Sequence, residues 1–256
     1  MSKFIACVLL AFMLNSVVDA RETVSIAAAA DLIYCVAELN SEFRKRNADV
    51  DVEASNGSSG MFFQQIRQGA PFDIFMSADL DYPRKLAAEG HMDAASLTLY
   101  AIGRIVLWTT QKDVNVDMGL PVLRDSKVQK IALANPEHAP YGRAAKAAIE
   151  KAGLWKEIEP KVVYGENIVQ AKQYAETGNA EIAVLALSLV KAPTMLGKGR
   201  YWQIPEDMYP TLEQGAGLTT AGKAKAGAQA YLEFLRTPEA RKIFGKYGFL
   251  LPTAKR

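Results

Sequence analysis

The sequence predicts an α/β fold of two lobes, in which each lobe is a mostly parallel sheet covered by helices. Short apolar segments alternate with segments of helical periodicity along almost the whole chain, and the loops between them are short. Two longer segments, 100–108 and 214–219, break this alternation, and we expect them to cross between the lobes. Residues 21–101 and 216–256 then form lobe I, and residues 102–215 form lobe II.

The first third of the chain predicts three strands, each followed by a helix. Apolar residues recur every three or four positions in the helical segments, and two of these end at a cap glycine, Gly69 or Gly90. Asp31 directly precedes the first helix, where we expect it to be the N-cap. The elements in order are a strand at 24–28, a helix at 32–43, a strand at 50–54, a helix at 61–68, a strand at 74–76 and a helix at 82–89.

The middle of the chain repeats this pattern, and its end is helical. Gly153 and Gly178 stand where two of the predicted helices stop. Continuous apolar runs in this region are typical of strands that are buried on both faces. The elements in order are strands at 102–108 and 131–134, a helix at 142–152, a strand at 162–163, a helix at 168–177, a strand at 182–185 and helices at 223–235 and 238–247.

Residues 1–20 have the pattern of a secretory signal peptide. Lys3 precedes the apolar run 4–14, and Val18-Asp19-Ala20 carries the small residues of a cleavage site. The apolar run is too short for a stable membrane span. We therefore expect the chain to be exported and released, with a mature N-terminus near Arg21.

Charge and residue usage argue against several functions. The 256 residues carry a formal net charge of +2, without a stripe of Lys and Arg between aromatic residues, so we expect no nucleic-acid partner. Cys35 is the only cysteine after residue 20, which excludes an internal disulfide and a cysteine metal site in the mature chain. His91 and His138 are the only histidines and lie far apart, which argues against a metal site or a Ser-His-Asp triad.

Four loops each follow a strand and open a helix, and this position favours anion binding. Unpaired N–H groups and the helix dipole direct positive partial charge outward at a helix N-terminus. In α/β folds such loops lie at the carboxyl ends of the strands, where ligands bind. A Gly/Ser run alone is more often a turn, but four converging loops without Lys or Arg suit a compact anion. The loops are 29–31, 57–60, 140–142 and 166–168.

Four motifs resemble the periplasmic molybdate-binding protein (ModA) family over essentially the whole mature chain. They are residues 27–32 (AAAADL), 57–60 (GSSG) with 65–79 (QIRQGAPFDIFMSAD), 135–142 (NPEHAPYG) and 247–249 (YGF). The resemblance implies a type II-like periplasmic binding protein whose two lobes close over a tetrahedral oxyanion, molybdate or tungstate. It also implies a periplasmic monomer that delivers this anion to the membrane permease of an ABC importer, with no cofactor and no enzymatic activity.

The resemblance also implies the residues that bind the oxyanion. Ser59 holds it through its hydroxyl and N–H groups, and Ser58 shapes the loop beside it. Tyr141 and Ile168 donate backbone N–H groups, while Ala30 and Asp31 belong to the first ligand loop. Two positions depart from the better-known members. Asp31 replaces a serine or asparagine, and Ala186 replaces a tyrosine that some members carry.

Asp31 raises an electrostatic problem, because a carboxylate would repel a dianion. Two unit charges 4 Å apart repel by about 4 kcal/mol at an effective dielectric constant of 20, so a dianion would face about twice that. Three arrangements avoid this cost. The carboxylate can turn away and cap Ile33 or Tyr34, it can be protonated, or the ligand can carry the proton, as hydrogen phosphate or arsenate does. We expect the first, because an N-cap is the common role of such an aspartate.

Three functions therefore compete. The first is a binding protein for molybdate or tungstate, and the second is a receptor for phosphate, sulfate or a small organic acid. The third is a secreted hydrolase with Ser58 or Ser59 as nucleophile, which we rank last because no histidine or nucleophile-elbow pattern accompanies that loop.

Overall fold

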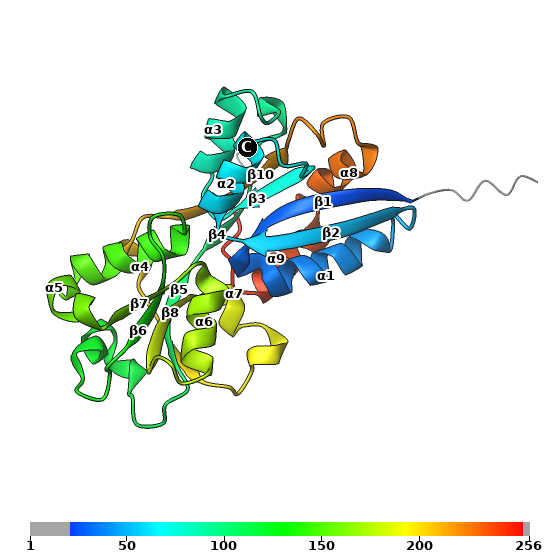
Figure 1. The fold of residues 1–256 in the computed structure, drawn as a ribbon. Helices are drawn as coiled ribbons and strands as arrows, with labels where there is room; N and C mark the ends of the chain where they lie inside the picture. Colours follow the sequence, from blue (N-terminus) through cyan, green and yellow to red (C-terminus); the bar gives the residue numbers. More distant parts are fainter. Residues whose placement is uncertain (1–20, 253–256) are drawn as a thin grey trace, which may run out of the picture.

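The chain folds into two five-stranded mixed sheets with flanking helices, arranged as two lobes (Figure 1). The computed structural model describes residues 21–252, so the expected signal peptide lies outside the described residues. Within the described part, we find no helix that combines the length and the apolar character needed to cross a membrane. The α/β class predicted from the sequence is confirmed.

Lobe I contains the first sheet, with the strand order β2-β1-β3-β10-β4. β1 pairs in parallel with β2 and β3, and β10 pairs antiparallel with β3 and β4. The strands are β1 Glu22–Ala29, β2 Val50–Gly57, β3 Ile74–Ser77, β4 Thr98–Gly103 and β10 Leu212–Leu218. The helices of this lobe are α1 Ile33–Arg44, α2 Ser59–Arg67, α3 Asp81–Ala88, α8 Ala226–Phe234 and α9 Pro238–Lys246.

Lobe II contains the second sheet, with the strand order β7-β6-β8-β5-β9. β6 pairs in parallel with β7 and β8, and β5 pairs antiparallel with β8 and β9. The strands are β5 Ile105–Thr109, β6 Ile131–Ala134, β7 Val162–Gly165, β8 Ile182–Ala186 and β9 Arg200–Gln203, and the helices are α4 Pro140–Lys151, α5 Trp155–Ile158, α6 Ile168–Glu176 and α7 Leu187–Val190. Short 3-10 helices complete both lobes: η1 Ala30–Leu32, η2 Ala94–Ser96, η3 Val116–Met118, η4 Leu120–Arg124, η5 Glu159–Lys161, η6 Pro193–Met195 and η7 Glu206–Met208.

Two expectations about the strands are wrong. The sheets are mixed rather than mostly parallel, because β10 and β5 enter from the other lobe and run against their neighbours. The single strand expected at 100–108 is two strands, β4 and β5, which belong to different sheets. Arg104 separates them, with its guanidinium donating to the Gly248 carbonyl and its own carbonyl accepting from the Leu187 N–H. Since β10 pairs along its length in the first sheet, we now propose residues 104–211 as lobe II.

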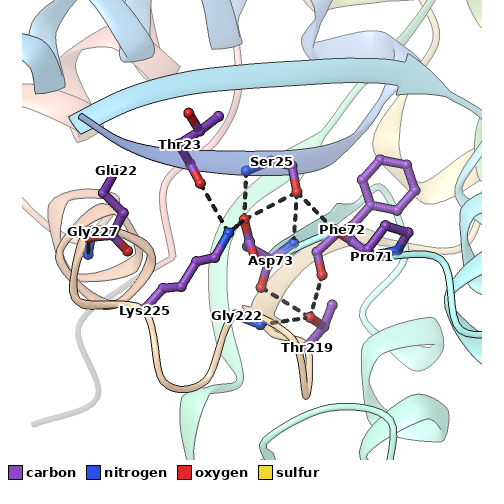
Figure 2. A network of polar contacts seen from close by, with 10 residues as sticks. All are labelled: Glu22, Thr23, Ser25, Pro71, Phe72, Asp73, Thr219, Gly222, Lys225 and Gly227. Atoms are coloured by element: carbon purple, nitrogen blue, oxygen red, sulfur yellow. Dashed lines mark hydrogen bonds and ion pairs between the residues drawn. The ribbon is translucent and has the colours of Figure 1, made fainter. Parts of the chain in front are cut away.

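A polar network holds together the end of the first sheet that lies away from the other lobe (Figure 2). Asp73 directly precedes β3, and its buried carboxylate accepts from the Ser25 N–H at 2.8 Å and from Lys225 Nζ at 2.8 Å. Lys225 also donates to the Thr23 carbonyl, and the Thr219 hydroxyl donates to the Phe72 carbonyl. These contacts tie β1, β3 and the segment after β10 together, so the opposite, carboxyl ends of the strands keep a defined position.

Candidate functional site

A small cavity lies between the lobes, at the carboxyl ends of strands from both sheets. The space open to the centres of water molecules is about 10 Å³, about that of one water site, so the cavity suits a compact ligand. Ala186 ends β8 and is buried, and it is not among the lining residues. All six residues predicted from the sequence line the cavity, namely Ala30, Asp31, Ser58, Ser59, Tyr141 and Ile168, together with Ala29, Gly57, Ala78, Ala139, Pro140 and Asn167.

The N-terminus of α2 brings Ser59 to the cavity wall. Ser58 is the N-cap, and its hydroxyl oxygen accepts a long bond of 3.4 Å from the Met61 N–H. The Ser59 Oγ accepts from the Ala78 N–H at 2.9 Å, which fixes the side chain across the end of β3. A hydroxyl that accepts a hydrogen bond still has its own hydrogen to donate. Ser59 can therefore donate to a ligand, whereas Ser58 acts within the loop.

Two helices of lobe II begin at the opposite wall. Pro140 occupies the first turn of α4, and Tyr141 follows it. Asn167 is the N-cap of α6, where its Oδ1 accepts from the N–H groups of Val169 and Gln170. The helix therefore begins at Ile168, whose N–H lies in the first turn and has no intrahelical acceptor.

Several backbone N–H groups at the cavity have no hydrogen-bond acceptor within residues 21–252. Among them are those of Ser59, Tyr141 and Ile168, each in the first turn of its helix. No lysine or arginine lines the cavity. Buried N–H groups without a partner are rare in proteins, and three of them at one site point to an acceptor supplied by a ligand.

Asp31 does not cap its helix, which corrects the expectation from the sequence. It lies inside η1, and neither η1 nor α1 has a side-chain cap. Instead, its Oδ2 accepts from the Tyr141 hydroxyl at 3.0 Å and from Gln214 Nε2 at 2.7 Å. Its Oδ1 is buried and has no hydrogen-bond partner. The carboxyl group thus faces the cleft and joins residues from both lobes.

Burial raises the pKa of the Asp31 carboxyl to about 6. Loss of hydration is the largest effect, because a buried carboxylate loses the water that stabilises its charge. Hydrogen bonds from Gln214 and Tyr141, together with the backbone N–H of Asp31, lower the pKa and oppose the effect of burial. The folded state therefore favours the neutral acid more than the unfolded state does.

We expect Asp31→Asn to stabilise the ligand-free protein at neutral pH. The pKa of Asp31 is about 6 when folded against 3.8 ordinarily, so between these values the folded state binds more protons and the free energy of unfolding falls as pH rises. The free energy of unfolding lost at pH 7 is at most about 3 kcal/mol, because opening of the cleft would return water to the carboxylate and limit the loss. Thermal melts at pH 4 and pH 7.5 test this. The melting temperature of the variant should equal that of wild type at pH 4 and be higher at pH 7.5. A lower melting temperature at pH 7.5 would contradict it.

Further contacts close the cleft around Asp31. The Gly60 N–H of lobe I donates to the His138 carbonyl of lobe II at 2.9 Å. The Ser188 hydroxyl donates to the Asp31 carbonyl at 2.8 Å. At the cleft edge, Arg143 Nη2 lies 2.6 Å from Asp79 Oδ2. The structure therefore represents a closed arrangement, in which α4 of lobe II contacts lobe I directly.

The sequence did not predict the contacts that Asp31 makes with residues far away along the chain. Tyr141 was expected to act through its N–H, but its hydroxyl also contacts Asp31. The sequence held one sign of Gln214, because it is a polar residue in a segment expected to be a strand, and the structure shows that it is fully buried.

The structure does not support the serine-hydrolase hypothesis. The His138 ring is bonded to the Glu166 carbonyl, and Ser59 Oγ accepts from the Ala78 N–H. Among the described residues, no cluster of His, Cys, Asp and Glu could hold a metal ion.

Known proteins are similar to this chain in both sequence and fold. The sequence matches the family of bacterial extracellular solute-binding proteins over residues 24–250. It is 39% identical to the molybdate-binding protein ModA of Rhodobacter capsulatus over 234 residues, which cover 88% of this chain and 90% of that protein. It is 38% identical to the molybdate-binding protein ModA of Azotobacter vinelandii over 226 residues, which cover 88% and 89%.

A solved structure has the same fold along its full length. The periplasmic molybdate-binding protein of Azotobacter vinelandii superposes with a TM-score of 0.84 at 29% sequence identity. The superposition covers 90% of this chain and 100% of that chain. Both lobes of the present structure therefore have counterparts in that protein.

Proposed function

Because this chain belongs to the bacterial extracellular solute-binding proteins, and among them to the ModA family, we propose that it binds molybdate between its lobes for an ABC importer. It is a binding protein rather than an enzyme. Molybdate is its cargo and not a cofactor. Tungstate has nearly the same size and charge, and we propose it as an alternative cargo.

One observation carries the proposal, namely the three unpaired N–H groups of Ser59, Tyr141 and Ile168 around one small cavity. With the Ser59 hydroxyl they make four donors for a tetrahedral oxyanion. Hydrogen bonds to a charged group contribute about 1.5–3 kcal/mol each, so four supply about 6–12 kcal/mol before the costs of association. Micromolar affinity corresponds to about 8 kcal/mol after those costs, so these four donors supply a large part of the binding energy and further contacts at the cavity must supply the rest.

We propose that six residues form the anion site: Ala30, Asp31, Ser58, Ser59, Tyr141 and Ile168. Ser59, Tyr141 and Ile168 are direct donors, while Ser58 shapes the α2 N-terminus and Ala30 allows close approach of the first loop. We also propose export through residues 1–20 to the periplasm, where the protein acts as a monomer and meets a membrane permease. No nucleic acid takes part.

A second candidate cargo is hydrogen phosphate, which the unpaired Asp31 Oδ1 favours. This anion carries a proton at neutral pH and could donate it to the carboxylate. Isothermal titration calorimetry with molybdate, tungstate, sulfate and phosphate at pH 7.5 distinguishes the candidates. We expect one-to-one binding of molybdate, micromolar or tighter, and at least about 100-fold weaker binding of sulfate and phosphate. Binding of phosphate without binding of molybdate would refute the proposal.

A further inference from the structure

Oδ1 of Asp31 is the one buried side-chain oxygen or nitrogen without a partner in residues 21–252. The side chain itself is held in place, because Oδ2 accepts from both Tyr141 and Gln214. Gln214 is oriented in turn, since its Oε1 accepts from the Tyr100 hydroxyl at 2.9 Å and its Nε2 also donates to Tyr141 Oη at 2.9 Å. The network therefore leaves one carboxyl oxygen at the cavity with no role inside the protein.

This arrangement determines where a proton on Asp31 can reside. Oδ2 already accepts two hydrogen bonds, and a proton there would displace one of the donors. Oδ1 accepts no hydrogen bond that meets normal geometry within residues 21–252, so we place the hydrogen of the neutral acid on Oδ1. That O–H finds no acceptor in the described protein. An anion in the cavity that Asp31 lines would supply one.

We propose that Asp31 binds the anion as a neutral acid, with one proton shared between Oδ1 and an anion oxygen, so that capture of a dianion takes up one proton from solution. This inference rests on the proposed function. It resolves the electrostatic conflict, because the repelling carboxylate becomes a fifth donor. The proton comes from solvent as the cleft closes, and it returns to solvent when the anion leaves.

Among residues 21–252, the groups that contact Asp31 or interact with it electrostatically carry no charge that could take this role. The titratable groups that its negative charge affects are Cys35 of α1, Tyr100 of β4 and Tyr141 of α4. Burial, and to a lesser extent the charge of Asp31, raises the pKa of each, so all stay neutral near pH 7. Its other contacts, Gln214 of β10 and Ser188 of α7, are uncharged.

Two further charged or titratable groups, on elements of lobe II near the cavity, have other partners. On α6, Lys172 is ion-paired with Glu176 at 2.6 Å. On the loop before α4, the His138 ring is bonded to the Glu166 carbonyl. His138 directly precedes the cavity residues Ala139, Pro140 and Tyr141, so it is the group to exclude experimentally.

Calorimetric titration with molybdate at pH 7.5, in two buffers of different ionisation enthalpy, counts the protons exchanged. We expect wild type to take up about one proton, and its Kd to rise about tenfold per pH unit between pH 7 and pH 9. Asp31→Asn presents an amide N–H in place of the acid, so we expect no proton uptake, a flat pH profile, and affinity at pH 9 above that of wild type. His138→Gln should keep the uptake of about one proton.

Several results would overturn the inference. It is wrong if wild type exchanges no proton and shows a flat pH profile, or if Asp31→Asn keeps the uptake and slope of wild type. It is also wrong if His138→Gln abolishes the uptake. If neither wild type nor Asp31→Asn binds molybdate between pH 6 and pH 9, the proposed function itself fails, and this inference fails with it. The wild-type proton count does not depend on the folding of any variant.

Discussion

Gly60→Ala is expected to weaken molybdate binding by at least about 100-fold while leaving the ligand-free protein at least as stable as wild type. A Cβ on Gly60 would lie 2.6 Å from the His138 carbonyl oxygen and 2.8 Å from its Cα and Cβ atoms. These contacts are made across the cleft, between α2 of lobe I and the loop before α4 of lobe II. The open protein can avoid the clash by keeping its lobes apart, so the substitution acts on closure and not on either lobe.

A second glycine provides the matched control for this effect. Gly245 lies within α9, and a Cβ there would meet nothing within 4 Å. Gly245→Ala should therefore bind molybdate like wild type and gain slightly in stability, since alanine favours helix over glycine. Calorimetric Kd values and ligand-free melting temperatures of the three proteins test the prediction. Wild-type affinity in Gly60→Ala would show that the anion is bound without the Gly60–His138 contact.

Ser59→Ala is expected to raise the Kd for molybdate by about 10- to 150-fold. The substitution removes one donor to a charged ligand, a loss of about 1.5–3 kcal/mol. It also leaves the Ala78 N–H without its acceptor, which costs stability in the ligand-free protein as well. Affinity is therefore measured by calorimetry below the melting temperature of the variant, so that only folded protein contributes.

The neighbouring serine separates the binding role from the local one. Ser58 accepts only the 3.4 Å bond of the α2 N-cap, so Ser58→Ala should lower stability by about 0.5–1 kcal/mol and change the Kd little. The two variants differ by one position in the same loop. A larger loss of affinity in Ser58→Ala than in Ser59→Ala would reverse the assignment of the two hydroxyl groups.

The sequence predicted the parts of this structure that depend on local patterns. Buried strands and amphipathic helices have characteristic periodicities, and the loop before α2 is identified by its glycines and serines. All six candidate residues line one cavity because the loops follow strands that end at the same edges of the two sheets. Strand direction was predicted less well, since β10 and β5 acquire their antiparallel pairing only by crossing between lobes.

The environment of Asp31 could not be predicted in the same way. A local rule made it an N-cap, but its partners Tyr141 and Gln214 lie 110 and 183 positions away along the chain. The burial that raises its pKa likewise comes from both lobes packing around the cleft. Such contacts depend on how the two sheets face each other, and the periodicity of the sequence does not predict this arrangement.

A crystal structure of the protein with molybdate, with the metal located by its anomalous scattering, tests the central claim most directly. We predict one molybdenum atom between the lobes, with anion oxygens accepting from the Ser59 hydroxyl and from the N–H groups of Tyr141 and Ile168. Asp31 Oδ1 should lie within hydrogen-bond distance of an anion oxygen and so make a further contact with the ligand. Molybdenum bound elsewhere, or between lobes with Ser59 and Ile168 out of contact, would contradict the account.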